Sequence, residues 1–523
     1  MSQTSSQQRG WLESRACYLA CALSMFANGT MNAFPVFSTK LLAAGLDTSQ
    51  IVITGVIIQM GYGLSSILFA AFYARTYTRL SLAGVDRAAN IFACSLVLGS
   101  LALLIGLLAN AEAVGEPVNG AALSFLFLVW GSGLGLSAFH SLSLVNFIFV
   151  ANKAQRRMAI ASMTFSLGIG SVVYTLLYQF VLNSISLINN MVVLLVSYVL
   201  ITGFRLVYMQ RGRFEAVPVL SELPALVPAD EEGRGSAEST TTLELGDLGS
   251  NSAESHHQGA HGDDLLHSTA SPPASDQIVA EAAPTVWSYL QSRIVWLLSV
   301  STFFGFGVGA TFLSSVGSLA ASLEESEAEI DALTFSLTLS LLCMMLVARL
   351  ATTIVYAHLN WPYVLAVWNV ALFVGILVFT ASPTMAGAYA SACLVGLGFG
   401  GISSVPAVVA TSNFPGSAQY YSVNVAVTAI LMSLGPFIIG YMQTVIEEKS
   451  RIRLGSGFEN LNTFIYFLVG SFFSTVCAVM LGYEIRKDYL LEMSVLRADP
   501  THDNEVLEMQ TRSNPRSLEI AQI

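Results

Sequence analysis

The sequence predicts an all-α integral membrane protein with twelve transmembrane helices. Hydrophobic residues make up 54% of the 523 residues, charged residues make up 11%, and the mean hydropathy is +0.63. A soluble domain carries roughly 25% charged residues. The apolar residues also form long runs, and a helix needs about twenty such residues to cross a bilayer. We therefore expect a membrane protein rather than a large soluble one.

The apolar runs form two sets of six. The first set predicts helices near residues 16–38, 51–74, 88–109, 122–150, 158–181 and 186–208. The second set predicts helices near 294–320, 332–357, 361–381, 386–412, 420–442 and 462–485. The expected parts are an N-terminal segment (1–15), a six-helix bundle (16–210), a central loop (211–290), a second six-helix bundle (291–487) and a tail (488–523). The loop and the tail are rich in small, polar and acidic residues, so we expect them to be disordered.

Basic residues predict the orientation of the chain, because cytosolic loops of membrane proteins carry an excess of Lys and Arg. The segments on the same side as the N-terminus hold most of these residues, including Arg75, Arg79, Arg156, Arg157 and Arg205. The opposite loops hold only Lys40, Lys449, Arg451 and Arg453. Both termini are therefore expected in the cytosol. The sequence leaves open whether the membrane is the plasma membrane or a vacuolar or other internal membrane.

The glycines of the fourth and tenth predicted helices indicate an internal repeat. The fourth contains Gly131-Ser132-Gly133-Leu134-Gly135, and the tenth contains Gly396-Leu397-Gly398-Phe399-Gly400. The same register, carried forward without a gap, aligns Gly170 with Gly435. Close helix packing is the simpler explanation of any one glycine in a membrane helix. Several in one register favour two related halves, as in many secondary transporters.

The sequence contains no motif of a soluble enzyme or a nucleotide-binding protein. The Gly-x-Gly patterns lie inside predicted membrane helices, and no zinc spacing, nucleophile elbow or P-loop occurs. The six cysteines all lie in apolar runs, so we expect buried side chains rather than disulfides. We therefore expect no enzymatic activity, no cofactor or metal, and no nucleic-acid partner.

Several short motifs occur in the order typical of one transporter group. The first helix continues through Asn28-Gly29-Thr30-Met31-Asn32-Ala33-Phe34-Pro35, the seventh ends with Ser315-Val316-Gly317-Ser318, and the eighth contains Arg349. In these motifs and in the glycines of the tenth helix, the chain resembles the Nodulin-like branch of the major facilitator superfamily. It is also similar to fungal homologues of monocarboxylate transporters in that branch. The resemblance implies two pseudo-symmetric six-helix bundles, secondary transport, and a cavity lined by helices 1, 4, 7 and 10.

The chain departs from the usual motifs of the superfamily and its branches at several positions. The loop after the second helix reads Tyr73-Ala74-Arg75-Thr76-Tyr77-Thr78-Arg79, without the usual aspartate. Met345 stands four residues before Arg349, where monocarboxylate carriers have an aspartate. These differences count against proton coupling and against a standard gating latch.

Two ionisable residues inside predicted helices are the main candidates for a binding site, because such groups are costly in a membrane and usually serve a function. Arg349 is expected either to bind an anionic substrate through its guanidinium or to form a gate between helices near the inner rim. His140 is expected either to relay a proton or hydrogen-bond a substrate, or simply to pack with its polar atoms satisfied. No acidic residue within a span is available to pair with His140.

Neutral polar residues complete the list of candidates. Asn28 and Asn32 are one turn apart on the first helix and share a face. These two amides could hydrogen-bond either a substrate or a neighbouring helix. Tyr178 on the fifth helix and Ser404, next to the glycines of the tenth, are further candidates for substrate binding.

The sequence favours a secondary transporter that moves a small polar or anionic metabolite, similar to a monocarboxylate, by alternating access. The rival hypothesis is a transporter-like receptor or assembly protein without translocation, whose central loop binds regulatory proteins. A channel is a third possibility, which the lack of a repeated filter or a ring of charges disfavours. The expected partners are a small-molecule substrate and membrane lipid.

Overall fold

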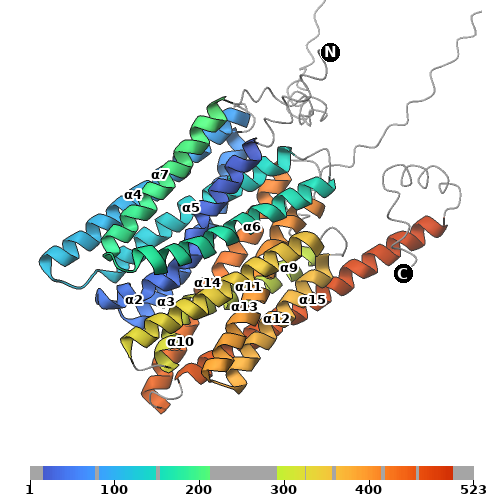
Figure 1. The fold of residues 1–523 in the computed structure, drawn as a ribbon. Helices are drawn as coiled ribbons and strands as arrows, with labels where there is room; N and C mark the ends of the chain where they lie inside the picture. Colours follow the sequence, from blue (N-terminus) through green and yellow to red (C-terminus); the bar gives the residue numbers. More distant parts are fainter. Residues whose placement is uncertain are drawn as a thin grey trace, which may run out of the picture. The chain divides into compact units, whose positions relative to one another are not determined.

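The computed structural model describes residues 16–76, 82–148, 153–211, 291–323, 326–355, 361–413, 418–454 and 459–498, and these residues are almost entirely helical (Figure 1). The elements are, in chain order, a helix over residues 16–28, η1 (Gly29–Ala33), α2 (Phe34–Ala43), α3 (Thr48–Thr76), α4 (Leu82–Val114), α5 (Gly120–Ile148), α6 (Lys153–Leu177), η2 (Tyr178–Leu182), α7 (Leu187–Arg211), α9 (Arg293–Ser314), α10 (Val316–Leu323), α11 (Glu327–Val355), α12 (Trp361–Ala381), α13 (Met385–Asn413), α14 (Ala418–Leu454) and α15 (Glu459–Ala498). The predicted central loop and most of the predicted tail lie outside the described residues.

Eleven helices of the described residues are long and apolar enough to cross a membrane. They correspond to the second to twelfth predicted spans. The first predicted span is built from three shorter pieces: the helix over residues 16–28, the 3-10 helix η1, and α2. The restart at α2 has a local cause, because Pro35 lies in its first turn, where proline costs no intrahelical hydrogen bond. The seventh span is also interrupted, at Ser315 between α9 and α10.

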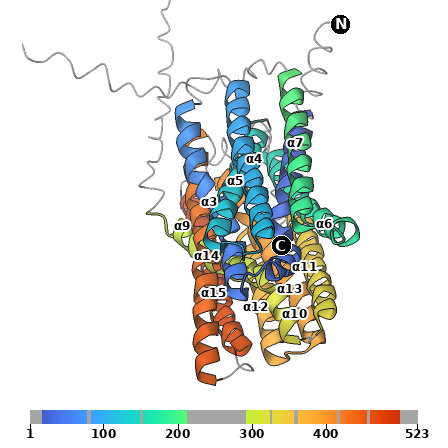
Figure 2. The ribbon, with the colours of Figure 1, turned by 90° about the vertical axis from the view of Figure 1, so that its left-hand side faces the viewer.

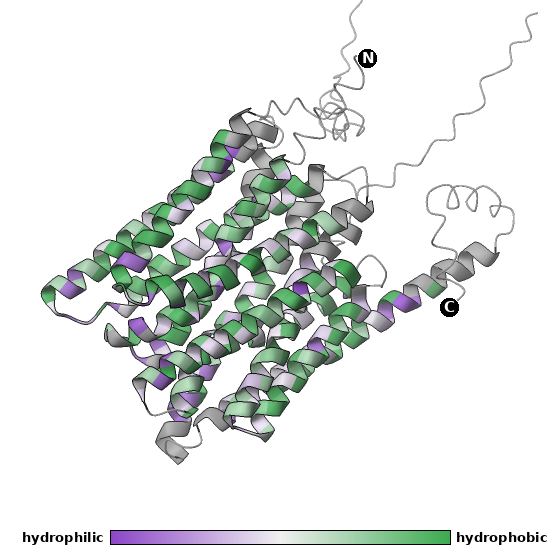
Figure 3. Cartoon of the chain, in the orientation of Figure 1, coloured by the Kyte–Doolittle hydropathy of each residue, from purple (hydrophilic) through white to green (hydrophobic). Residues whose placement is uncertain are grey.

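The outward-facing side chains are those of a protein in lipid. Phe180, Leu200 and Leu103 are 78%, 67% and 64% exposed, and many other large apolar side chains are also exposed on the outer surface. Figure 3 shows apolar residues along most of the length of the helices. Such a surface would be unfavourable in water and is stable only where lipid tails cover it. The chain is an integral, multi-pass membrane protein.

The glycine contacts repeat between the first half (residues 16–211) and the second half (residues 291–498). A Cβ atom on glycines of the fourth and tenth spans would collide with backbone carbonyls of the second and eighth spans, and a Cβ on Gly170 or Gly435 would collide with the first or seventh span. The matching contacts are Gly131 with Ile58 and Gly396 with Leu341, Gly135 with Tyr62 and Gly400 with Met345, and Gly170 with Phe26 and Gly435 with Phe303. The predicted glycine register therefore coincides with equivalent helix crossings in both halves.

Successive spans alternate in direction, so the turns at 44–47, 115–119, 183–186 and 382–384 all lie at one end of the helices, which we call the turn end. Figure 2 shows the first half (blue to green) and the second half (yellow to red) as two groups of helices. The helix α15 continues to Ala498, past the predicted boundary of the second bundle at 487.

Candidate functional site

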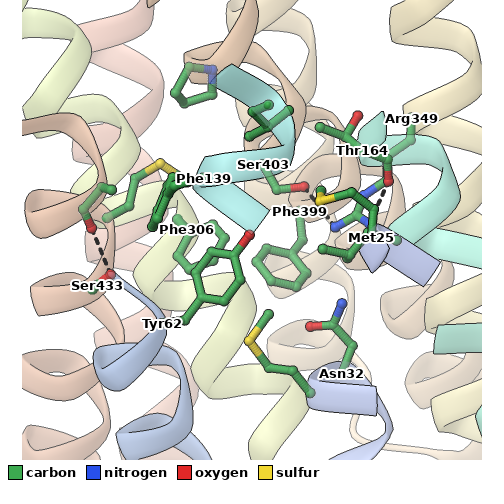
Figure 4. Close-up of a pocket in the computed structure, with 16 residues that line it drawn as sticks. Met25, Asn32, Tyr62, Phe139, Thr164, Phe306, Arg349, Phe399, Ser403 and Ser433 are labelled. Atoms are coloured by element: carbon green, nitrogen blue, oxygen red, sulfur yellow. Dashed lines mark hydrogen bonds between the residues drawn. The ribbon is translucent and has the colours of Figure 1, made fainter. Parts of the chain in front are cut away.

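The two halves enclose a cavity of about 100 Å³, which is room for several water molecules. Eight lining residues come from each half, and they lie on the first-span helix, η1, α3, α5 and α6 and on α9, α11, α13 and α14. The lining residues are Met25, Met31, Asn32, Tyr62, Phe139, Leu142, Thr164, Leu167, Phe306, Arg349, Phe399, Ser403, Pro406, Ala429, Met432 and Ser433 (Figure 4). Spans 1, 4, 7 and 10 contribute to this wall, as the resemblance implied, together with spans 2, 5, 8 and 11.

Arg349 is the one charged residue among the described residues of the cavity wall. It is 4% exposed and lies on α11. Its Nη1 donates to the backbone oxygen of Thr164 at 3.0 Å, and its Nη2 donates to Ser403 Oγ at 3.2 Å. Its Nε has no hydrogen-bond partner. The guanidinium therefore retains an unused N–H donor, and its hydrogen bond to Thr164 joins the second half to the first.

A second polar group lies on the wall at η1. Asn32 Nδ2 donates to Ser171 Oγ at 3.1 Å, and Gln59 Nε2 donates to Asn32 Oδ1 at 3.4 Å. Both amide side chains are buried, and Gln59 Oε1 has no hydrogen-bond partner. Asn32 is thus held from two sides by α3 and α6, with its side chain pointing into the cavity (Figure 4).

Aromatic rings fill the space between these polar groups. Tyr62 and Phe139 lie on the first half with ring centroids 5.4 Å apart, and Phe306 and Phe399 lie on the second half with centroids 5.1 Å apart. Figure 4 shows the Tyr62 hydroxyl on the side of the cavity that carries Ser403 and Arg349. The wall is otherwise apolar, so the polar groups fix the orientation of any ligand.

The halves are in contact at the turn end. The helix α2 of the first half packs on α9, α10 and α11 of the second. A Cβ on Gly317 of α10 would lie 2.9 Å from Ser38 Oγ. Lys40, just past the predicted first span, donates to the backbone oxygens of Asn183 (2.9 Å) and Ile185 (2.6 Å). Burial lowers the pKa of the Lys40 ammonium, and the charge of Asp331 in the second half opposes that shift.

The structure brings two of the six predicted site residues, Arg349 and Asn32, to the cavity wall. Ser404 lies directly behind it, where it receives a hydrogen bond from the Thr164 hydroxyl at 3.3 Å. His140 is 1% exposed, packs 6.5 Å from the Phe69 ring, and is not among the described lining residues.

Asn28 and Tyr178 lie elsewhere in the first half. Asn28 is fully buried and neither amide atom has a hydrogen-bond partner. The repeat register that pairs Phe26 with Phe303 pairs Asn28 with Gly305. A Cβ on Gly305 would contact Ser474 and Asn369, which belong to the same half as Gly305 and do not line the cavity. Tyr178, in the π-helix η2, packs edge-to-face on Phe37 at 5.1 Å, with Lys40 Nζ 5.4 Å from its ring centroid.

Two ionisable residues near the ends of spans lie within helices of the structure. Arg205 is 1% exposed within α7 and donates to Ser24 Oγ and Ser141 Oγ, both at 2.7 Å. The helix α14 continues through Glu447, whose Oε1 accepts a hydrogen bond from Gln443 at 2.7 Å. The predicted helix 186–208 already contains Arg205, whereas the predicted helix 420–442 ends before Glu447 and is shorter than α14.

Known structures of transporters share this architecture. The proton:xylose symporter XylE matches over 91% of this chain and 96% of its own, with a TM-score of 0.61 and 10% identity. This chain has the major facilitator fold. A D-xylose-proton symporter (TM-score 0.58, 14% identity, 88% of this chain and 96% of that one) and the E. coli fucose:proton symporter FucP (TM-score 0.50, 13% identity, 88% and 97%) also match. No protein-family model and no curated protein sequence matches the chain.

Within the major facilitator fold, the cavity lies where the two six-helix bundles meet. Its wall is asymmetric in charge. The register that pairs Tyr62 with Met345 also pairs Ser66 with Arg349, so only the second half supplies a cation at this level. The missed lining residues Tyr62, Phe139 and Phe399 are aromatic residues of apolar helices. The family resemblance placed the helices of Phe139 and Phe399 at the cavity, and no sequence signal placed the helix of Tyr62 there.

Proposed function

We propose that the chain is a secondary transporter that moves a small polar or anionic metabolite, similar to a monocarboxylate, across a membrane by alternating access. The observation that carries the proposal is Arg349, a buried guanidinium on the wall of a cavity between the two bundles. A cation removed from water is stable only with partners that compensate for lost hydration. Its described hydrogen-bond partners are a carbonyl and a hydroxyl, both neutral, which leaves it suited to an anionic ligand.

The same contacts supply a mechanism for coupling binding to movement. Arg349 bonds to the Thr164 carbonyl of the other half, and the Thr164 hydroxyl bonds to Ser404. A carboxylate that approaches the guanidinium competes with the neutral carbonyl, and charge-assisted hydrogen bonds are the stronger kind. Binding would therefore loosen a bond between the bundles and favour the rocking motion of alternating access.

Proton coupling is not part of this proposal, although the similar structures are named as proton symporters. Among the described residues of the cavity wall there is no Asp, Glu or His. We therefore propose facilitated diffusion, or movement driven by the substrate's own charge.

A neutral sugar is the second candidate substrate, because the similar structures are sugar symporters and the wall carries an amide and aromatic rings. The rival function, a receptor or assembly protein without translocation, relies on the central loop, which lies outside the described residues. We propose cytosolic termini from the distribution of basic residues, and a vacuolar, other internal or plasma membrane location from the branch resemblance.

A thermal-shift screen of the detergent-purified protein against carboxylates, other anions and neutral sugars tests the proposal. A ligand at about a hundred times its Kd adds roughly 2.7 kcal/mol of stability. We expect carboxylates to raise the Tm of the wild type, to have no effect on Arg349→Gln, and to have a reduced effect on Arg349→Lys, which keeps the charge but loses the planar fork. Stabilisation by neutral sugars in all three proteins would instead support the second candidate.

A further inference from the structure

The two polar parts of the cavity wall, Arg349 and Asn32, bond to two different places along the helix α6. Arg349 bonds to Thr164 and Asn32 bonds to Ser171, and both partners lie on α6. These partners are seven residues apart, which is about 10 Å at 1.5 Å of rise per residue. A ligand that contacts both groups must therefore carry polar atoms at two places, separated by roughly 5–10 Å once each hydrogen bond is allowed for.

The Asn32 end is neutral and has capacity both to donate and to accept. An amide offers two N–H donors and an oxygen with two lone pairs. Asn32 uses one donor on Ser171 and one acceptor position on Gln59. The remaining donor and acceptor match a hydroxyl group, which does both, better than a carboxylate, which only accepts.

The amide is also held in a fixed position. Gln59 and Ser171 hold it from α3 and α6, and a Cβ on Gly29, three residues earlier, would lie 2.6 Å from the Leu167 backbone oxygen of α6. Gln59 is 4% exposed, yet its Oε1 has no partner. An unsatisfied acceptor in a buried site destabilises the protein. The hydrogen bond that Gln59 donates to Asn32 is a contact that could offset this cost.

We propose that Asn32 binds a hydroxyl group of the transported anion, that Gln59 is a positioning residue for Asn32, and that the substrate is a polyhydroxylated carboxylate such as a sugar acid. The proposal rests on the anion-transporter function proposed above. Arg349 binds the carboxylate, the hydroxylated chain lies along the aromatic rings between, and a distal hydroxyl reaches Asn32. A simple fatty carboxylate leaves the remaining donor and acceptor of Asn32 without a partner, which a site built for a hydroxyl discriminates against strongly.

The test compares three six-carbon probes with the purified full-length protein. Gluconate has the carboxylate and the hydroxyls, hexanoate has only the carboxylate, and sorbitol has only the hydroxyls. We expect gluconate to bind at least about tenfold more tightly than hexanoate or sorbitol. We expect Asn32→Leu to reduce the ratio of gluconate to hexanoate affinity by about tenfold, with little change for hexanoate.

Gln59→Met separates a positioning role from a structural one. Gln59→Met removes both the unpartnered Oε1 and the long Nε2 hydrogen bond to Asn32, and these effects oppose each other. We therefore expect the ligand-free Tm to change little, while the gluconate to hexanoate ratio falls about threefold or more. The matched control is Gln443→Met. Gln443 is 1% exposed, and its two amide atoms bond to Ser315 and Glu447 outside the described cavity wall. This variant should lose stability and keep the wild-type ratio.

Each outcome bears on a different proposal. If Arg349→Gln abolishes binding of both carboxylates but gluconate and hexanoate bind equally, the hydroxyl site is wrong and the anion transporter stands. If Gln59→Met lowers the ligand-free Tm and leaves the ratio unchanged, the positioning role is wrong. If neither carboxylate binds, or if Arg349→Gln binds both normally, the proposed function fails together with this inference.

Discussion

Two buried arginines have different surroundings at the residue scale. Arg205 and Arg349 are 1% and 4% exposed, but only Arg349 lies on the cavity wall. Arg205 joins α7 to the first-span helix and to α5 through two serine hydroxyls. We propose that Arg205 stabilises the first half and that Arg349 binds the substrate.

Replacing Arg205 with alanine should destabilise the protein without removing its binding site. The variant leaves a cavity and two serine hydroxyls without their donor, for which we expect a loss of about 2–4 kcal/mol. Thermal unfolding in detergent measures this change. Arg87→Ala is the matched control, since Arg87 is exposed at the start of α4, and it should change the Tm little. Equal effects of both substitutions would contradict the role assigned to Arg205.

The candidate residues were predictable from the sequence only in part. A charge inside an apolar run singled out Arg349, because such groups are rare in membranes. Asn32 could not be separated from Asn28 by sequence, since both are amides one turn apart, and the 3-10 geometry of η1 decides which one reaches the wall. Nothing in the sequence indicated that Tyr178 packs beneath Lys40 at the turn end.

At the scale of elements, glycine contacts determine how closely the helices pack. Gly131 and Gly396 occupy equivalent places in the two halves, each against a carbonyl of the neighbouring helix. The sequence predicted these spans and their register, because hydropathy identifies lipid-facing helices and the glycines repeat. It could not predict the breaks at η1 and Ser315, which depend on packing between spans as well as on Pro35.

Alanine at either glycine should push two helices apart. For Gly131→Ala and for Gly396→Ala we expect a loss of about 1–3 kcal/mol, because the added methyl group has no room. The control is Gly99→Ala on the exposed side of α4, where a Cβ meets nothing within 4 Å. That substitution should stabilise the helix by about 0.5–1 kcal/mol. Thermal unfolding of the three variants measures these changes. A Gly131→Ala variant as stable as the wild type would contradict the close crossing of the two helices.

At the scale of the whole molecule, the structure has its halves in contact at the turn end and a cavity further along the helices. If the basic residues indicate the orientation correctly, the turn end faces away from the cytosol. Alternating access then requires that the contact of α2 with α10 and α11 open once in each transport cycle.

A disulfide across this contact should stop the cycle. Ser38 Cβ lies 4.0 Å from the position of a Cβ on Gly317, a separation that a disulfide can bridge. We expect Ser38→Cys/Gly317→Cys to lose transport in proteoliposomes under oxidising conditions and to recover it on reduction. Each single variant should transport under both conditions. Undiminished transport by the cross-linked double variant would show that the turn end does not open.

Transport of an anion without protons should move charge across the membrane. A membrane potential of 100 mV is worth about 2.3 kcal/mol per charge, or about fiftyfold in the equilibrium distribution. We expect a potential positive inside proteoliposomes to drive accumulation of a monovalent carboxylate. Accumulation driven by a pH gradient and insensitive to the potential would contradict the absence of proton coupling.

The most direct test of the account is the flux of a radiolabelled carboxylate into proteoliposomes that contain either the wild type or Arg349→Gln. We predict saturable uptake by the wild type, and uptake by Arg349→Gln that does not exceed that of protein-free liposomes. Normal uptake by Arg349→Gln would contradict the role of the guanidinium. Binding of the carboxylate without any flux in the wild type would contradict transport itself and favour a receptor.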